Sequence, residues 1–327
     1  KNAIYTQMKV TMDKLSVTAG LRYDHVPYNK TAQLAPRIGM SYSITPITKF
    51  NLAYGQYFQT PNYWMLMNPN NAYPLKHTFT HQQVAGLEHY FAEDIKGTFE
   101  IYHKSYHNNP VYVANTTADP LDGRLGFTDI GEGRSYGAEL FLQKKFAQKW
   151  YGTFSYSHSK SEGKDPREGK NEYYPWDFDF ENVMTIIGGY KFKFRESKWY
   201  QRMRDSFIFP YISWLPFMVS DQLEVSFRYS YSGGRPYTPK TYDFIHRRWF
   251  VDSTEDINTA RSDYYSRLDI MILRRFNFKK INVTTFLDIQ NIFDRDNEWA
   301  IMYLDDGSTE MSYQYKQMPI GGIIIEF

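Results

Sequence analysis

Apolar and polar residues alternate along the last part of the chain, from Lys280 to Phe327. Between Ile281 and Gln290 one set of alternate positions is apolar and the other mostly polar, which is the pattern of a β-strand with two unlike faces. After a polar loop around Asp305, the chain ends in three isoleucines, a glutamate and Phe327. Chain termini are usually frayed and solvated, so an aliphatic and aromatic end predicts that this end is held in a sheet.

The same alternation recurs along the whole chain and predicts roughly thirteen strands of about nine to fourteen residues. Strands of soluble sheets usually have five or six residues, whereas these are long enough to cross a bilayer at a tilt. The predicted strands lie near residues 3–12, 15–24, 37–44, 50–55, 80–91, 95–102, 136–142, 150–157, 183–194, 223–232, 268–273, 281–290 and 313–325.

The predicted connections alternate between short and long. Tight turns are expected near residues 13–14, 45–48, 92–94, 147–149 and 277–279, and long loops near residues 59–78, 107–132, 161–180, 234–263 and 293–311. Strict alternation of this kind is typical of outer-membrane barrels, which have periplasmic turns and extracellular loops. The sequence therefore predicts an all-β fold, an antiparallel transmembrane β-barrel over residues 1–327.

One connection on the short-turn side is long. Residues 195–222 carry several Arg and Lys together with aromatic and aliphatic side chains, namely Trp199, Tyr200, Phe207, Phe209, Tyr211, Trp214, Leu215, Pro216, Phe217 and Met218. An amphipathic segment at the inner membrane interface would explain both kinds of residue. A small hydrophobic cluster under a long loop would explain the rings equally well.

Composition narrows the classes of protein. Phe, Trp and Tyr make up 18% of the residues, which suits two aromatic belts at membrane interfaces, although a soluble Tyr-rich β protein remains an alternative. The absence of cysteine excludes disulfides and thiolate sites. A formal net charge of +2 does not favour nucleic acid as a partner, and no apolar run is long enough for a transmembrane helix.

The number of predicted strands is odd. Bacterial single-chain barrels have an even number of strands, and the chain opens at Lys1 directly in strand-like sequence without a signal peptide. Counting back from a last strand that runs towards the periplasm makes the first strand run the same way. We therefore expect the chain to be the C-terminal part of a larger barrel.

Six short motifs, in this order and spacing, resemble the barrels of TonB-dependent outer-membrane receptors. They are APRIGMSY (35–42), YGQYFQTP (54–61), SYGAEL (135–140), YSGGRPYTP (231–239), SRLD (266–269) and DIQNIFDR (288–295). Barrels of that family have 22 strands around an N-terminal plug, so the resemblance implies that this chain supplies about the last thirteen and lacks the plug. Pro319 and Gly321-Gly322 depart from a regular last strand, and we expect a bulge or a late strand start there.

The resemblance also implies a function and partners. It implies import of a scarce nutrient such as a siderophore, glycan or peptide, energised by the TonB-ExbB-ExbD complex through an N-terminal region that this sequence lacks. Outer-membrane lipids, a surface lipoprotein lid and the outer-membrane insertion machinery are further implied partners, and Phe327 resembles the terminal aromatic residue that this machinery reads. An alternative is that the same barrel serves as a structural subunit of an outer-membrane assembly.

Catalytic, cofactor and metal sites are not indicated. His77 and His81, like His103 and His107, are four residues apart, which in a strand separates them by about 13 Å, too far to share a metal ion directly. Asp177, Asp179 and Glu181 offer oxygen ligands for Ca²⁺, but we prefer the interpretation that they face a polar lumen or pair with nearby Arg. Asp305 and Asp306 are expected to form a turn.

Ligand capture is expected in the long loops, because function concentrates on loops that a rigid wall holds. Aromatic residues for stacking and arginines for clamping an anion form the predicted binding set: Tyr63, Trp64, Tyr174, Trp176, Trp299, Arg235, Arg247 and Arg248. Tyr73, Tyr173, Trp249 and Tyr303 are further stacking candidates. The alternative for each is an aromatic belt or a cation that anchors the protein to the lipid leaflet.

Overall fold

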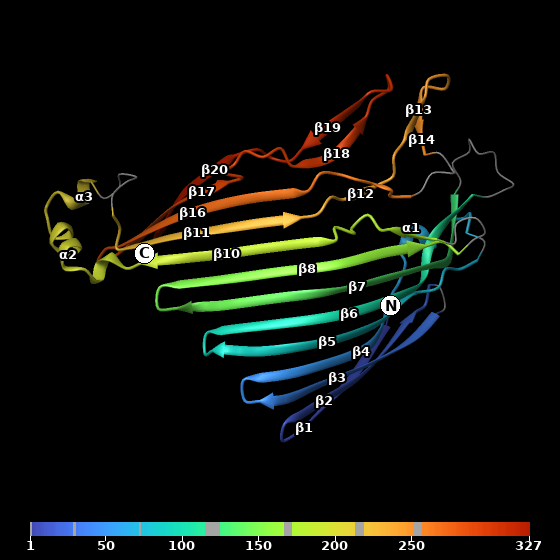
Figure 1. The fold of residues 1–327 in the computed structure, drawn as a ribbon, viewed down its shortest axis with the longest axis horizontal. Helices are drawn as coiled ribbons and strands as arrows, with labels where there is room; N and C mark the ends of the chain where they lie inside the picture. The colour runs from blue at the N-terminus through green and yellow to red at the C-terminus, as the bar shows by residue number, and fades with distance from the viewer. Residues whose placement is uncertain are drawn as a thin grey trace.

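One antiparallel sheet forms most of the molecule in the computed structural model (Figure 1). The structure describes residues 2–28, 31–71, 73–114, 125–166, 172–212, 219–251 and 257–327. Along the sheet the strands follow the order β1-β2-β3-β4-β5-β6-β7-β8-β10-β11-β16-β17-β20, which is thirteen strands, with β9 paired to β8 beside this path. The predicted number of strands and their antiparallel order are confirmed.

The strands of the sheet are long. Their bounds are β1 (Asn2–Met12), β2 (Leu15–Val26), β3 (Thr31–Thr45), β4 (Thr48–Gln59), β5 (Thr78–Ala92), β6 (Ile95–Ala114), β7 (Leu125–Ala147), β8 (Trp150–Lys164), β9 (Tyr173–Pro175), β10 (Asn182–Phe192), β11 (Gln222–Ser232), β16 (Tyr265–Asn277), β17 (Asn282–Gln290) and β20 (Met318–Glu326). A short helix, α1 (Tyr63–Leu66), lies in the connection from β4 to β5. No helix in the described part of the chain is long and apolar enough to cross a membrane.

The two edge strands point the same way. Because each strand on the path is antiparallel to its neighbour, thirteen strands place the ends of β1 and β20 at the same end of the sheet, as expected from the sequence. That end carries the tight turns (Figure 1). No pairing joins β1 to β20 within the described residues, so the sheet is open.

Two predictions about the connections are wrong. The connection from Val26 to Thr31 lies on the long-loop side but is short, so the alternation is not strict. The loop predicted at residues 107–132 is mostly strand, because β6 and β7 continue to pair as far as Ala114 and Leu125. Two register shifts, beside Asn109, interrupt the period-two pattern there, which is why periodicity did not reveal the extension. Residues 115–124 lie outside the described residues.

The sheet has one apolar and one polar face. Residues directly opposite each other share a face, and Val225 pairs with Ile272, which pairs with Leu287. The opposite face carries ion pairs between its side chains, among them Arg22–Asp24, Lys96–Glu88, Lys191–Glu224 and Arg267–Asp269. In a transmembrane barrel the apolar face meets lipid and the polar face lines the lumen, so we name them the lipid face and the lumen face.

The exceptional connection, between β10 and β11, is helical. It contains η2 (Phe194–Glu196), α2 (Lys198–Arg204) and α3 (Phe209–Ile212), at the end of the sheet that holds the tight turns (Figure 1). Tyr200 and Phe209 form a buried cluster with Phe276 of β16, which confirms the predicted hydrophobic cluster. Residues 213–218, with five of the predicted apolar residues, lie outside the described residues.

The last strand is regular once it begins. β20 starts at Met318, immediately before Pro319, and pairs with β17 without a register shift. Proline cannot donate a hydrogen bond to the ladder, which explains the start there. The expected late start is confirmed, and the alternative bulge is absent from β20.

Candidate functional site

Three small two-stranded units lie at the end of the sheet opposite the tight turns. They are formed by β12 (Pro236–Tyr237) with β15 (Ala260–Arg261), by β13 (Thr241–Asp243) with β14 (Arg248–Phe250), and by β18 (Glu298–Tyr303) with β19 (Thr309–Tyr313). The first two belong to the connection from β11 to β16, and the third to the connection from β17 to β20 (Figure 1). Residues from two separate connections therefore meet here.

The two hairpins β13–β14 and β18–β19 pack against each other through aromatic rings. The ring centroids of Trp249 and Tyr303 are 4.8 Å apart, and the Trp249 indole Nε1 donates a hydrogen bond of 2.8 Å to the carbonyl of Leu304. The Tyr242 hydroxyl donates to the carbonyl of Asp305, which lies in the predicted turn before Ser308. Trp249 thus joins two loops, and its indole N–H is already used.

Beside these hairpins is a cavity of about 760 Å³. A volume of this size falls in the range of small-molecule sites. Its lining combines aromatic and apolar side chains with charged ones, and we call it the loop cavity. The residues that line it include Tyr237, Tyr265, Trp299, Ile301, Tyr303 and Met311 on the apolar side, and Asp177, Arg235, Lys240, Asp263 and Glu298 on the charged side.

Two cations in the loop cavity differ in their partners. The Lys240 ammonium lies 4.7 Å from the centroid of the Tyr303 ring, a cation–π contact. Arg235 is exposed and forms no ion pair with any described residue, while its backbone N–H donates to the hydroxyl of Ser262. Arg235 is therefore the guanidinium that can meet an anionic group of a ligand.

The carboxylates of the cavity are held by the protein itself. Asp263 forms a 2.7 Å ion pair with Arg295, and Glu298 accepts a hydrogen bond of 2.8 Å from the backbone N–H of Asp263. Burial raises the pKa of the Tyr303 hydroxyl above its ordinary value, so this phenol stays protonated and able to donate. The lining of the loop cavity thus combines carboxylate acceptors, held in place by the protein, with aromatic surface.

An ion-pair cluster around a buried carboxylate lies next to residues that line the cavity. The guanidinium of Arg261 lies 2.6 Å from Asp179 and 3.0 Å from Glu181. The third carboxylate of this stretch, Asp177, accepts a hydrogen bond of 2.8 Å from the Asn258 side chain. The preferred interpretation, pairing with a nearby arginine, is confirmed for Asp179 and Glu181. The described residues contain no group of three His, Asp or Glu side chains placed to hold a metal ion.

The structure brings two of the predicted binding residues into this cavity, Arg235 and Trp299. Arg247 and Arg248 lie on the exposed β13–β14 hairpin and are not among the cavity's lining residues. The three arginines predicted as an anion clamp therefore do not line one cavity. Tyr303, a further stacking candidate, does line it.

The other predicted binding residues lie on different loops. Tyr63 and Trp64 belong to α1, are exposed, and make edge contacts with Tyr28 and Phe127. Tyr174 is the middle residue of β9, which pairs with the end of β8. These aromatic residues surround the loop end of the sheet without joining the loop cavity.

Trp176 is packed on the backbone. An added Cβ would lie 2.1 Å from its ring at Gly163 and 2.3 Å at Gly133, two glycines that face each other on β8 and β7. Its ring also contacts Tyr106 at 5.0 Å and lines a smaller cavity of about 420 Å³ beside Thr60 and Asn109. The glycines thus make room for this indole on the lumen face.

The cavity residues that sequence reasoning missed include Tyr237, Lys240, Asp263 and Glu298. They lie on or near the very short strands β12, β15 and β18, in loops that have no periodicity to read. Pairing of Pro236 with Arg261 places Tyr237 opposite Ala260, and Tyr237 and Asp263 both line the cavity. One signal for them was available in the sequence: Lys240 directly follows the YSGGRPYTP motif (231–239) in a long loop.

The comparisons with known proteins agree with this architecture. The family model described as TonB dependent receptor-like, beta-barrel matches residues 1–292. No curated protein matches the chain. Among solved structures, the fold is similar to that of the pyoverdine outer membrane receptor FpvA from Pseudomonas aeruginosa, with a TM-score of 0.65 at 13% identity over 99% of this chain and 41% of that one.

Two further structures show the same similarity. The ferric yersiniabactin uptake receptor FyuA from Yersinia pestis has a TM-score of 0.64 at 13% identity, over 99% of this chain and 45% of its own. The outer membrane transporter YddB from Escherichia coli has a TM-score of 0.66 at 10% identity, over 99% and 44%. The chain spans about two-fifths of the length of these structures. Family and fold together place it in the outer membrane of a Gram-negative bacterium, and it belongs to the β-barrel family of TonB-dependent receptors.

Proposed function

We propose that this chain forms part of the wall and outer mouth of a receptor that captures a scarce nutrient for TonB-energised import, without catalysing a reaction. The observation that carries the proposal is the loop cavity of about 760 Å³ at the loop end of the sheet. Its mixture of aromatic surface, an unpaired guanidinium and fixed carboxylates suits a ligand that has both rings and polar groups.

The likeness to receptors for iron-binding ligands supports a siderophore as the first class to test. FpvA is named as bound to pyoverdine and FyuA as a ferric yersiniabactin receptor. A sequence identity of 13% supports a shared fold but not a shared ligand. Glycans and peptides are therefore tested as well. Coupling to TonB-ExbB-ExbD, and cover by a surface lipoprotein, are parts of the same proposal.

The binding step can be tested with the full-length protein that contains this chain, purified in detergent. A panel of ferric siderophores, oligosaccharides and short peptides is titrated while tryptophan fluorescence is recorded. For a panel member that binds, Trp299→Ala and Arg235→Gln are expected to weaken binding at least tenfold, because each removes a direct contact. Trp64→Ala serves as the matched control on another loop.

Two results would contradict the proposed site. Binding that is unchanged in both cavity variants and lost in Trp64→Ala would move the site to the β4–β5 loop. The structural-subunit alternative would be favoured by a second result. In it, the correctly inserted protein binds no panel member, and growth on each panel nutrient does not require TonB. The import step itself is measured as uptake that stops when TonB is absent.

A further inference from the structure

The helical connection between β10 and β11 rests on the lipid face of the sheet. Phe276 lies opposite Val283, and both belong to the same set of alternate positions as Ile272 and Leu287, the residues that define the lipid face. Phe276 is in the buried cluster, and Val283 packs against it. The segment therefore lies outside the barrel wall, at the end that carries the tight turns (Figure 1).

Polar contacts fix the segment in this position. Arg204 of α2 pairs with Asp221 at 3.2 Å, and Asp221 in turn accepts a hydrogen bond of 2.6 Å from the backbone N–H of Asn277. Arg204 also donates to the carbonyl of Asn277. The Tyr200 side chain, with none of its surface exposed, fills the space beneath. Burial, and to a smaller extent the negative charge of Asp221, raise the pKa of the Tyr200 hydroxyl above its ordinary value.

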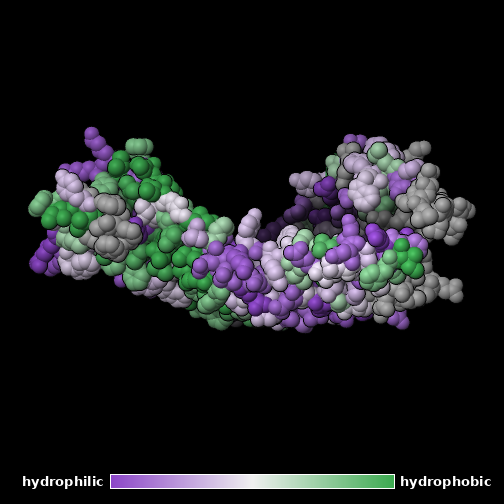
Figure 2. Space-filling model, turned by 90° about the horizontal axis from the view of Figure 1, so that it is seen from above, coloured by the Kyte–Doolittle hydropathy of each residue, from purple (hydrophilic) through white to green (hydrophobic). Residues whose placement is uncertain are grey.

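The outer surface of the segment is both apolar and basic. Trp199 is 53% exposed, Phe207 83% and Tyr211 74%, and Figure 2 shows hydrophobic residues gathered at this end of the molecule. Three cations of the same stretch are exposed and form no ion pair with a described residue: Arg195, Lys198 and Arg202. Large exposed rings beside unpaired cations are the composition of segments that lie at a lipid headgroup layer.

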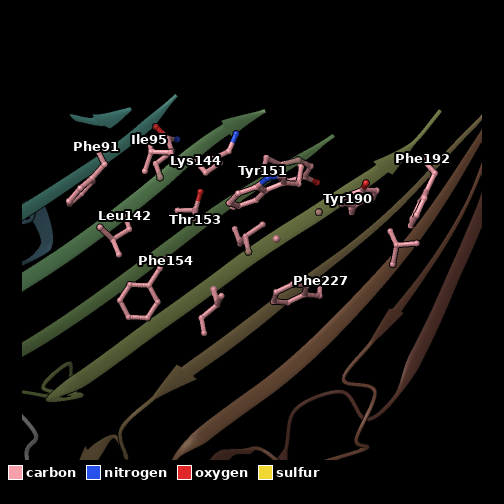
Figure 3. A pocket seen from close by; sticks show the side chains of 18 residues that line it. Phe91, Ile95, Leu142, Lys144, Tyr151, Thr153, Phe154, Tyr190, Phe192 and Phe227 are labelled. Atoms are coloured by element: carbon pink, nitrogen blue, oxygen red, sulfur yellow. The ribbon is translucent and has the colours of Figure 1, made fainter. Parts of the chain in front are cut away.

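An apolar groove runs along the lipid face from this segment. It has a volume of about 990 Å³ and lies across β5, β6, β7, β8, β10 and β11 (Figure 3). Its floor is open at Gly152, whereas the Phe227 ring covers Gly188 directly opposite. Phe192 lines the groove and stacks on Phe194 at 5.8 Å, and Phe194 contacts Trp199. The groove and the segment are therefore one continuous surface.

From this continuity we infer that the protein binds an anionic phospholipid of the periplasmic leaflet. Its phosphate headgroup lies against Arg195, Lys198 and Arg202, and one acyl chain lies in the groove over Gly152. The occupant follows from two observations. The surface faces lipid, and three of its exposed cations form no ion pair with a described residue. The inference does not depend on which nutrient is imported.

The headgroup part can be tested on the full-length protein in detergent, with phosphatidylglycerol and phosphatidylcholine added separately. Phosphatidylglycerol is expected to bind more tightly, as read by native mass spectrometry of bound lipid. A variant with Arg195→Gln, Lys198→Gln and Arg202→Gln should bind it roughly 100-fold more weakly, at about fivefold per cation. Binding of phosphatidylcholine should change little.

A matched control removes three lysines from tight turns at the same end, Lys14→Gln, Lys149→Gln and Lys279→Gln. These lysines are exposed, and the change in net charge is equal. For this control the inference predicts that the affinity for phosphatidylglycerol falls by less than about threefold. Equal loss in the control, or equal affinity for both lipids, would show non-specific attraction and overturn the inference.

The groove is tested separately with Gly152. An added Cβ there meets only ordinary contacts, 3.4 Å from the carbonyl of Ile187, so Gly152→Ala should fold and bind lipid normally. Gly152→Leu places a longer side chain in the groove and is expected to lower the affinity for phosphatidylglycerol at least tenfold. Unchanged lipid affinity in a correctly inserted Gly152→Leu protein would contradict the acyl-chain part.

Discussion

Arg261 and Asp179, 82 residues apart in the chain, form an ion pair of 2.6 Å next to residues that line the loop cavity. The Asp179 side chain is completely buried, whereas that of Arg261 is 29% exposed. Asp179 also accepts a hydrogen bond of 2.7 Å from the backbone N–H of Ser161, and Arg261 donates to the carbonyl of Gly234. One pair thereby ties the β8–β10 connection to the β11–β16 connection.

Replacing Arg261 should loosen the loops. Arg261→Ala leaves a buried carboxylate without its cation, and a loss of about 3 kcal/mol of stability is expected. The measurement is the urea midpoint at which the full-length protein loses its folded migration on a detergent gel. Ligand binding at the loop cavity should weaken as well, because Arg235 lies beside this pair.

An exposed ion pair provides the control for that variant. Lys316 and Asp296 are 3.0 Å apart, with both side chains largely exposed, and exposed pairs contribute at most about 1 kcal/mol. Lys316→Ala should therefore leave the urea midpoint almost unchanged. If Arg261→Ala were equally silent, the pair would have no supporting role.

Glycine at position 163 is required by the indole of Trp176. Gly163→Ala brings a Cβ to 2.1 Å from the indole nitrogen, so the ring must move, at a cost of about 1 to 3 kcal/mol. Combining it with Trp176→Leu should recover part of the loss, and a double-mutant cycle on urea midpoints measures this coupling. In Gly20→Ala the nearest atom is 3.6 Å away, and little change is expected; equal costs at both glycines would refute the steric explanation.

Two neighbouring aromatic residues of α2 should behave differently. Tyr200→Ala empties a fully buried site and is expected to cost about 3 to 5 kcal/mol. Trp199→Ala removes an exposed ring and should change the stability in detergent by less than about 1 kcal/mol. Thermal midpoints of the detergent-solubilised protein compare the two, and a larger effect at Trp199 would be inconsistent with the packing described.

Phe327 is proposed to serve assembly. Its side chain is fully exposed and follows the end of β20, so deleting it removes no packing contact of the described chain. We expect less barrel inserted in the outer membrane, measured by fractionation, while the inserted molecules keep their ligand affinity. Ile320→Ala, inside β20, is the control within the same strand, and normal insertion without Phe327 would exclude the role.

Periodicity alone was sufficient for the wall of the barrel. Strands such as β11 have a strict alternation because one face meets lipid and the other polar side chains, and each position therefore reports its own environment. The number of strands followed from local sequence, and so did the irregularity at Pro319, for which the structure selects a late start of β20 over a bulge. The extra length of β6 and β7 did not, because register shifts beside Asn109 break the period.

The candidate site depended on tertiary structure. The sequence offered Trp299 and Arg235 as two of many aromatic and basic loop residues, and it also offered Arg247 and Arg248, which the fold places on an exposed hairpin. Contact between the β13–β14 and β18–β19 hairpins determines which of these residues line the loop cavity. Such contacts join residues far apart in the chain, so no local pattern encodes them, whereas the alternation of the strands is imposed residue by residue by lipid and lumen.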